Sequence, residues 1–147
     1  MGYRNGKFLP DNTSPSRNQN NDLPVFRYSD IILMKAEAIL RGGAPTQGQT
    51  ALTLVNQLRA VRTTSPALGS VNLEDLYAER CREFAWEAWH RNDMIRFGKY
   101  EGSWGFKTNS DKNRRIFPIP TSAMTVIPAL VQNPGCWLQC WNFIKCK

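Results

Sequence analysis

One stretch decides the fold of this chain: Glu79-Arg-Cys-Arg-Glu-Phe-Ala-Trp-Glu-Ala-Trp-His-Arg-Asn-Asp-Met-Ile-Arg-Phe-Gly-Lys99. Within it and just before it, apolar residues recur at steps of three and four, which is the period of one helix face. These residues are Leu73, Tyr77, Cys81, Phe84 and Ala88. Asn72 is a suitable N-cap, and Gly98 is a suitable stop. The pattern predicts a single long helix from Leu73 to Lys99.

The other face of this predicted helix is acidic and carries an indole. Glu79 and Glu83 lie there with Trp86 and His90. Because a fully solvated helix face rarely displays tryptophan, we expect both faces to be covered, so that Trp86 is shielded from water.

Two shorter helices are predicted upstream. The mostly apolar run from Asp30 to Leu40 follows Ser29, a plausible N-cap, and stops at Gly42-Gly43. A second periodic segment runs from Thr46 to Arg62. Their short connection favours an antiparallel, tetratricopeptide-like helical hairpin.

The rest of the chain is predicted to be largely irregular. Residues 1–24 are rich in Asn, Ser, Asp, Gly and Pro and should form a lead-in without regular structure. After the long helix, the prolines of Arg115-Ile-Phe-Pro-Ile-Pro120 enforce an extended backbone. A short helix from Thr121 to Val126 and a turn at Gln132-Asn-Pro-Gly135 follow. The fold class is therefore mostly α, with extended C-terminal loops.

Charge and hydropathy argue against two classes of function, nucleic-acid binding and a role that requires a membrane-spanning helix. The formal net charge is +7, but the cations alternate with glutamates, whereas a nucleic-acid surface clusters like charges. We therefore expect no nucleic-acid partner. No run approaches the roughly 20 apolar residues that cross a bilayer. The first ten residues lack the apolar region of a secretory signal, so we expect any export signal or lipid anchor to lie outside this sequence.

The four cysteines do not predict a metal site. Cys81 belongs to the apolar helix stripe and is interpreted as a small buried residue. Cys136, Cys140 and Cys146 are concentrated in the tail, and their spacing matches no zinc pattern. A disulfide among them would require an oxidising compartment, and its connectivity cannot be read from sequence.

Five motifs occur in an order that resembles the C-terminal part of the SusD/RagB family, over about residues 24–135. They are the segments 26–38, 56–62, 79–99, 117–120 and 132–135. On this resemblance, residues 25–135 form a helical domain in which the hairpin is a scaffold. Residues 136–147 depart from the family, because Cys136 stands where an aromatic residue is usual and the tail beyond it has no counterpart.

The resemblance implies a surface-exposed lipoprotein of the outer membrane that functions in nutrient uptake. It would bind glycan oligomers or similar nutrients and pass them to a SusC-like, TonB-dependent outer-membrane transporter, without enzymatic activity and without a cofactor. In the family the ligand contacts come largely from regions N-terminal to this part. The alternative is a helical protein-interaction module of tetratricopeptide type, and a nucleic-acid binder ranks third.

The glutamates of the long helix are interpreted as structural. Glycosidase carboxylates flank a bond from opposite sides, about 5 to 9.5 Å apart, whereas Glu79 and Glu83 share one helix face with cations that keep them ionised. We predict an interhelical ion network that holds this helix to the hairpin. Its members are Glu79, Arg80, Arg82, Glu83, Glu87, Arg91, Arg59 and Arg62.

Two further positions are candidate sites, one for catalysis and one for ligand binding. His90 is the only histidine, and Cys81 should lie more than two turns away on a different face, so His90 is interpreted as structural and no catalytic residue is predicted. Trp104, flanked by glycine and serine, has Tyr100 close by. Because carbohydrate sites stack sugar rings on aromatic side chains, Trp104 and Tyr100 are the candidate ligand-binding residues. The alternative is that Trp104 packs back onto the helices.

Overall fold

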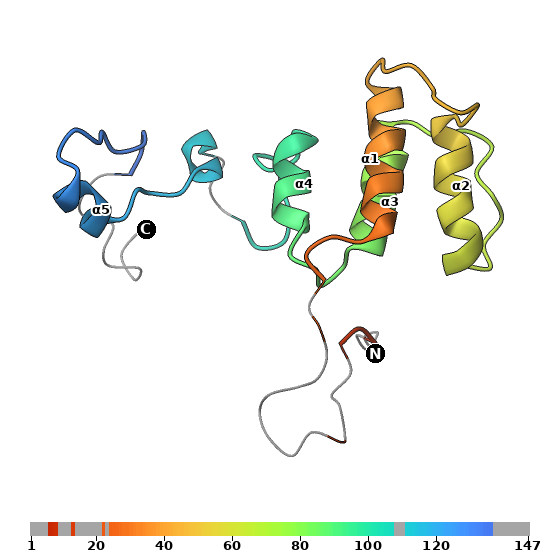
Figure 1. Cartoon of the computed structure of the whole chain (residues 1–147), viewed down its shortest axis with the longest axis horizontal. Helices are drawn as coiled ribbons and strands as arrows, with labels where there is room; N and C mark the ends of the chain where they lie inside the picture. Colours follow the sequence, from red (N-terminus) through yellow and green to blue (C-terminus); the bar gives the residue numbers. More distant parts are fainter. Residues whose placement is uncertain (1–5, 9–12, 14–21, 23, 108–110, 137–147) are drawn as a thin grey trace. The chain divides into compact units, whose positions relative to one another are not determined.

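The computed structural model describes residues 6–8, 13, 22, 24–107 and 111–136 (Figure 1). Across these residues the regular structure is entirely helical, with five α-helices, one short 3-10 helix and no strand. The mostly α fold class is therefore confirmed. Most of the predicted lead-in and the tail that holds Cys140 and Cys146 lie outside the described residues. The chain divides into two compact units, Met1–Phe97 and Gly98–Lys147.

The first unit begins with the predicted hairpin. Helix α1 spans Tyr28–Leu40 and α2 spans Ala51–Arg62. At the end of α1, Gly42 takes a φ of 101°, and the N–H of Gly43 donates to the carbonyl of Ala38 at 2.8 Å. Together with the bond from Gly42 N–H to Ile39, this is a Schellman motif, which stops the helix where the glycine pair predicts.

Both helices start at positions that differ from the sequence prediction. Helix α2 begins at Ala51, not at Thr46, because Gln47 and Gly48 adopt positive φ values that a helix cannot contain. Thr50 then caps it by accepting a hydrogen bond from the N–H of Thr53 at 3.2 Å. Helix α1 has Arg27, not Ser29, at its N-cap position.

The hydrophobic core lies where α1 packs against α2 and α3 (Figure 1). Leu33 of α1, Val55 of α2 and Leu76 of α3 are fully buried at its centre. The loop from α2 to α3 is fastened to this core by Asn56, whose side chain exchanges two hydrogen bonds with the backbone of Leu68, at 2.8 and 2.9 Å. The hairpin and the third helix thus form one packed body.

The prediction of a single long helix from Leu73 to Lys99 is wrong. Helix α3 spans Leu73–Glu83, and a separate helix, α4, spans His90–Arg96. Between them the backbone reverses through two left-handed residues, Trp86 at a φ of 67° and Ala88 at 62°. Trp86 is also 73% exposed, so the prediction that it would be covered is wrong as well.

The buried face of α3 is likewise not the predicted apolar stripe. Leu73, Tyr77 and Cys81 are only half-buried. The buried side chains are Leu76, Glu79, Arg80 and Glu83. Charged side chains can occupy a buried face only when partners neutralise them, and α3 has those partners on its neighbours. Asn72 caps α3 by accepting from the N–H groups of Glu74 and Asp75 at 2.8 and 3.0 Å, as predicted for this position.

The second unit contains the 3-10 helix η1, Lys112–Arg115, and α5, Thr121–Val126. The extended segment between them is clamped by the turn that follows α5. Gln132 accepts from the N–H of Ile119 at 2.8 Å and donates to its carbonyl at 3.0 Å, while Asn133 donates to the carbonyl of Phe117 at 2.7 Å. Two motifs that the sequence places apart therefore meet as one structure. In the described part of the chain, no helix has the length and apolar character needed to cross a membrane.

Candidate functional site

A row of three glutamates along α3 and the turn after it forms the centre of the site. The side chains of Glu79, Glu83 and Glu87 are only 6%, 7% and 3% exposed. Glu79 and Glu83 lie one turn apart on the same side of α3, and Glu87 continues the row from the turn that follows the helix. Three buried carboxylates so close together require cations from elsewhere in the fold.

Glu83 binds two arginines from the hairpin. Arg27, just before α1, donates from Nη1 to Oε1 of Glu83 at 2.7 Å, and Arg62, at the end of α2, donates from Nε to Oε2 at 3.1 Å. Burial alone would raise the pKa of Glu83, but these hydrogen bonds outweigh it and hold the pKa below its usual value. Glu83 is therefore a fixed anion that joins α3 to both helices of the hairpin.

Glu87 is held by Arg27 and by Lys7. Arg27 donates from Nε to Oε2 at 2.8 Å, and Lys7 donates from Nζ to Oε1 at 2.6 Å. Here too, burial would raise the pKa of Glu87, and the bonds from Arg27 and Lys7 lower it further than burial raises it. The pKa of Arg27 is raised, because its two carboxylate partners outweigh the effect of burial.

Glu79 forms the third part of the row. Its Oε2 accepts from Nη1 of Arg59 on α2 at 2.9 Å and from Nη2 of Arg82, one turn along α3, at 2.6 Å. Within the described part of the chain, each of the three glutamates thus has at least two cationic partners. A carboxylate held in this way is a poor general acid, because a catalytic acid needs a raised pKa.

A second set of charges lies deeper. Arg80 is completely buried and donates from Nη1 to Asp30 at 2.8 Å and from Nε to Asp93 at 2.9 Å. Its guanidinium also lies 4.8 Å from the ring centroid of Phe84. Since Asp30 belongs to α1 and Asp93 to α4, the buried triad Asp30–Arg80–Asp93 connects three helices.

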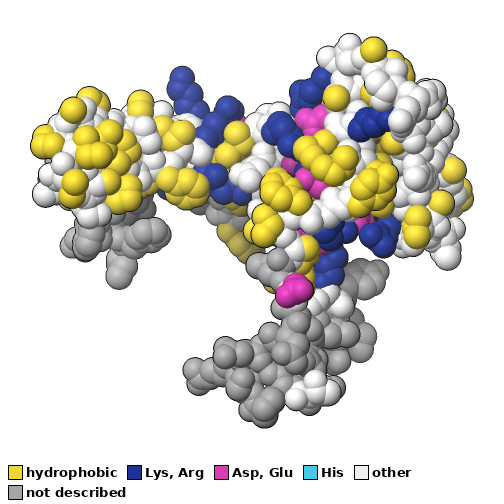
Figure 2. Space-filling model, in the orientation of Figure 1, with side chains coloured by type: hydrophobic (Ala, Val, Ile, Leu, Met, Phe, Trp, Pro, Cys, Tyr) yellow, Lys and Arg dark blue, Asp and Glu magenta, His cyan; other side chains and the backbone are white. Residues whose placement is uncertain are grey.

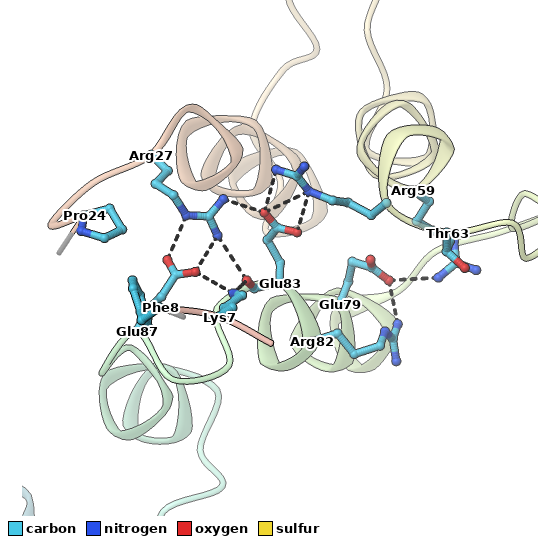
Figure 3. Close-up of a pocket in the computed structure, with 11 residues that line it drawn as sticks. Lys7, Phe8, Pro24, Arg27, Arg59, Thr63, Glu79, Arg82, Glu83 and Glu87 are labelled. Atoms are coloured by element: carbon cyan, nitrogen blue, oxygen red, sulfur yellow. Dashed lines mark hydrogen bonds and ion pairs between the residues drawn. The ribbon is translucent and has the colours of Figure 1, made fainter. Parts of the chain in front are cut away.

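The glutamate row borders a groove of about 570 Å³, shown in Figure 3. The close-up shows Arg27 between Glu83 and Glu87, Lys7 reaching Glu87 from the opposite side, and Arg59 and Arg82 meeting at Glu79. We call this feature the arginine groove. It is lined by Lys7, Phe8, Pro24, Arg27, Arg59, Arg62, Thr63, Glu79, Arg82, Glu83 and Glu87.

The structure brings most of the predicted ion network together, with two changes. Arg80 belongs to the buried triad and not to the glutamate row. Arg91 lies on α4, and Glu87 is contacted by Arg27 and Lys7, which the predicted network does not include. Sequence reasoning missed Arg27, Lys7, Asp30 and Asp93, because helical spacing reveals only partners within one element. The sequence does carry one sign of these partners: the row of glutamates needs more cations than its own helix supplies.

The interpretation of His90 and Cys81 as distant residues is wrong. Because the backbone turns back between α3 and α4, Nδ1 of His90 lies 3.6 Å from Sγ of Cys81. Burial raises the pKa of the Cys81 thiol, which disfavours the thiolate form that nucleophilic catalysis needs. Burial and a hydrogen bond with Cys81 raise the pKa of Tyr77 to about 12. No group of three or more His, Cys, Asp and Glu side chains in the described residues is arranged to hold a metal ion.

The predicted ligand-binding pair lies in the second unit. The ring centroids of Tyr100 and Trp104 are 6.0 Å apart, and Nε1 of Trp104 donates to the carbonyl of Tyr100 at 2.9 Å. Nζ of Lys107 lies 5.4 and 5.6 Å from the two centroids. Trp104 is 40% exposed. The pair is thus a partly exposed aromatic surface with a cation beside it.

Comparison with known proteins shows the family of this chain. Residues 1–136 match the SusD family, and the chain belongs to that family. It is 29% identical over 145 residues to the starch-binding protein SusD of Bacteroides thetaiotaomicron, an alignment that covers 92% of this chain and 25% of the relative. It is 33% identical over 142 residues to the SusD-like protein P38 of Formosa agariphila, which covers 88% of this chain and 27% of that protein. The chain therefore spans about a quarter of the length of these relatives.

Proposed function

We propose that this chain is part of a cell-surface nutrient receptor that binds oligosaccharides. The observation that carries the proposal is the family match over residues 1–136, together with a relative named as starch-binding. The charged groups support binding over catalysis, because each glutamate of the row forms ion pairs with two cations, and the pKa values of Glu83 and Glu87 are lowered by their cationic partners. The receptor captures its ligand and releases it chemically unchanged.

The resemblance extends the proposal to location and partner. The receptor is a lipoprotein on the outer face of the outer membrane, and it delivers its ligand to a SusC-like, TonB-dependent transporter. Capture by the receptor raises the local concentration of the nutrient at the transporter, so no cofactor is needed. A helical scaffold fixed by buried ion pairs suits this role, since a rigid body presents a binding surface at low entropic cost.

Isothermal titration calorimetry with the 147-residue chain tests oligosaccharide binding. The ligands are short neutral and acidic oligosaccharides, among them maltotriose and trigalacturonic acid. The Trp104→Ala variant tests the aromatic surface with maltotriose: loss of stacking should weaken binding of this neutral ligand several-fold, whereas Phe106→Ala, at a fully exposed neighbouring ring, should change it less. Absence of heat with every oligosaccharide would refute the proposal for this chain. Capture of a peptide partner in the same absence would favour the interaction-module alternative.

A further inference from the structure

The arginine groove exposes its cations and hides its anions. The three carboxylate side chains are at most 7% exposed, whereas those of Arg62 and Arg82 are 51% and 59% exposed. Lys7 is 36% exposed. Figure 2 shows dark blue side chains of Lys and Arg at the surface of the helical unit, with magenta side chains of Asp and Glu between them. Among the charged groups of the groove, the cations are therefore more accessible to solvent than the carboxylates.

The groove also has an excess of positive charge. Five cations and three carboxylates line it, so two positive charges remain after every glutamate has been neutralised. Low-dielectric walls focus such a field and increase the local concentration of anions. Each of the five cations contacts at least one of the glutamates, and the excess arises because five cations share three carboxylates.

Several N–H groups of the groove's arginines have no hydrogen-bond acceptor among the described residues. Arg62 contacts Glu83 through Nε and Nη2, and Arg82 contacts Glu79 through Nη2. Within the described part of the chain, Nη1 of Arg62 and both Nε and Nη1 of Arg82 have no hydrogen-bond acceptor. Nε of Arg59 is buried and has no partner there either. Exposed guanidinium edges with free N–H groups are well suited to bind a carboxylate, often through two parallel bonds.

We propose that the arginine groove binds the carboxylate groups of an acidic oligosaccharide. The inference rests on the proposed function and names its substrate class. A volume of about 570 Å³ lies within the range of about 300 to 1,000 Å³ that is usual for small-molecule sites, so the groove holds more than a lone ion. Phe8 and Pro24 add apolar surface beside the cations, against which the C–H face of a sugar ring packs. Arg62 and Arg82 bind the ligand, and Arg27 and Arg59 hold the buried glutamates behind them.

Calorimetry with trigalacturonic acid tests this inference, with maltotriose as the neutral ligand of equal length. The full chain should bind the acidic trimer at least about tenfold more tightly than maltotriose, since the neutral trimer has no carboxylate to form charge-assisted hydrogen bonds with the arginines. The affinity should fall as ionic strength rises. The Arg62→Gln/Arg82→Gln variant should lose this preference, and it leaves Glu83 with Arg27 and Glu79 with Arg59.

Lys112→Gln/Arg114→Gln is the charge-matched control, because it removes two exposed cations from the second unit. It should retain full affinity, and circular dichroism should show native helix content in both variants. Equal binding of the two trimers, or unchanged binding by Arg62→Gln/Arg82→Gln, would overturn the inference. Binding of maltotriose alone would refute the acidic class and leave the proposed function standing, whereas binding of neither would refute both. If the groove bound a hexaglutamate peptide more tightly than the acidic trimer, the proposal that its ligand is an oligosaccharide would be refuted.

Discussion

Arg80 shows how strongly one residue can determine a fold. Its guanidinium is fully buried between the carboxylates of Asp30 and Asp93. Removing one member of a buried ion pair leaves an uncompensated charge and usually costs about 3 to 5 kcal/mol. We therefore expect Arg80→Ala to lower the free energy of unfolding by that amount, or to prevent folding, as measured by urea denaturation monitored by circular dichroism.

Arg82→Ala is the matched control, two residues along the same helix. Its side chain is 59% exposed, and Glu79 keeps its contact with Arg59. An exposed ion pair contributes about 0 to 1 kcal/mol, so this variant should unfold near the wild-type midpoint. Similar losses for the two variants would show that burial of Arg80 does not set its importance.

The glutamate row makes stability depend on pH. Glu83 and Glu87 have folded-state pKa values below their usual value, and the unfolded value for glutamate is about 4.3. Their stabilising contribution is therefore complete above that pH and is lost as the pH falls through the folded values. Urea denaturation over this acidic range should show a steep loss of stability for the wild type.

In Glu83→Gln/Glu87→Gln that acid dependence should be shallower, although the variant is less stable at neutral pH because it leaves cations unpaired. Glu74→Gln, at an exposed position in the first turn of α3, should keep the wild-type slope. Parallel pH profiles for the wild type and the double variant would contradict this role of the glutamate row.

At the scale of elements, the break between α3 and α4 rests on two left-handed residues. Ala88 has a φ of 62°, a conformation that costs a residue with a Cβ atom about 1 to 2 kcal/mol. Glycine adopts it without that cost, so Ala88→Gly should stabilise the protein by up to about 1 kcal/mol. The midpoint of urea denaturation measures the gain.

Ala78→Gly provides the opposite case, because Ala78 lies within α3. Glycine in a helix interior destabilises by about 0.5 to 1 kcal/mol relative to alanine. The two substitutions should therefore shift the midpoint in opposite directions. A loss of stability in both would indicate a continuous helix through residue 88.

The break between α3 and α4 also shows which helix ends can be predicted from the sequence and which cannot. Gly42-Gly43 and Asn72 are strong local signals, and the helices end or begin beside them. The apolar spacing, in contrast, continues through Phe84 and Ala88 without a glycine or proline, so periodicity alone indicates one helix. What separates α3 from α4 is tertiary: Asp93 must turn back to reach the buried Arg80.

The candidate site was predictable to a similar extent. The four-residue spacing of Glu79 and Glu83 indicates a need for cations. Arg59 and Arg62 belong to the hairpin, and they reach these glutamates if the hairpin packs on α3. Arg27 was not identified, because it lies outside any helix and 56 residues from Glu83 in the chain. Contacts over such a separation depend on how the helices pack, which no local pattern encodes.

At the scale of the whole molecule, the buried residues are unevenly distributed. In the first unit, Leu33, Val55 and Leu76 are completely or almost completely inaccessible to solvent. In the described residues of the second unit none is buried, and its order comes from side-chain clamps such as Gln132 on Ile119. Since apolar burial is the main favourable contribution to folding, the first unit should hold most of the stability.

Native-state hydrogen exchange measures this difference residue by residue. Amides in the cores of α1, α2 and α3 should exchange only through global unfolding, whereas those of α5 should exchange through openings that cost far less free energy. Gln132→Ala should remove the remaining protection at Ile119, whose N–H then loses its acceptor, and should leave protection at Leu33 and Val55 unchanged. If α5 were protected as strongly as α1, the second unit would share a cooperative core with the first, and burial within each unit would not determine where the stability lies.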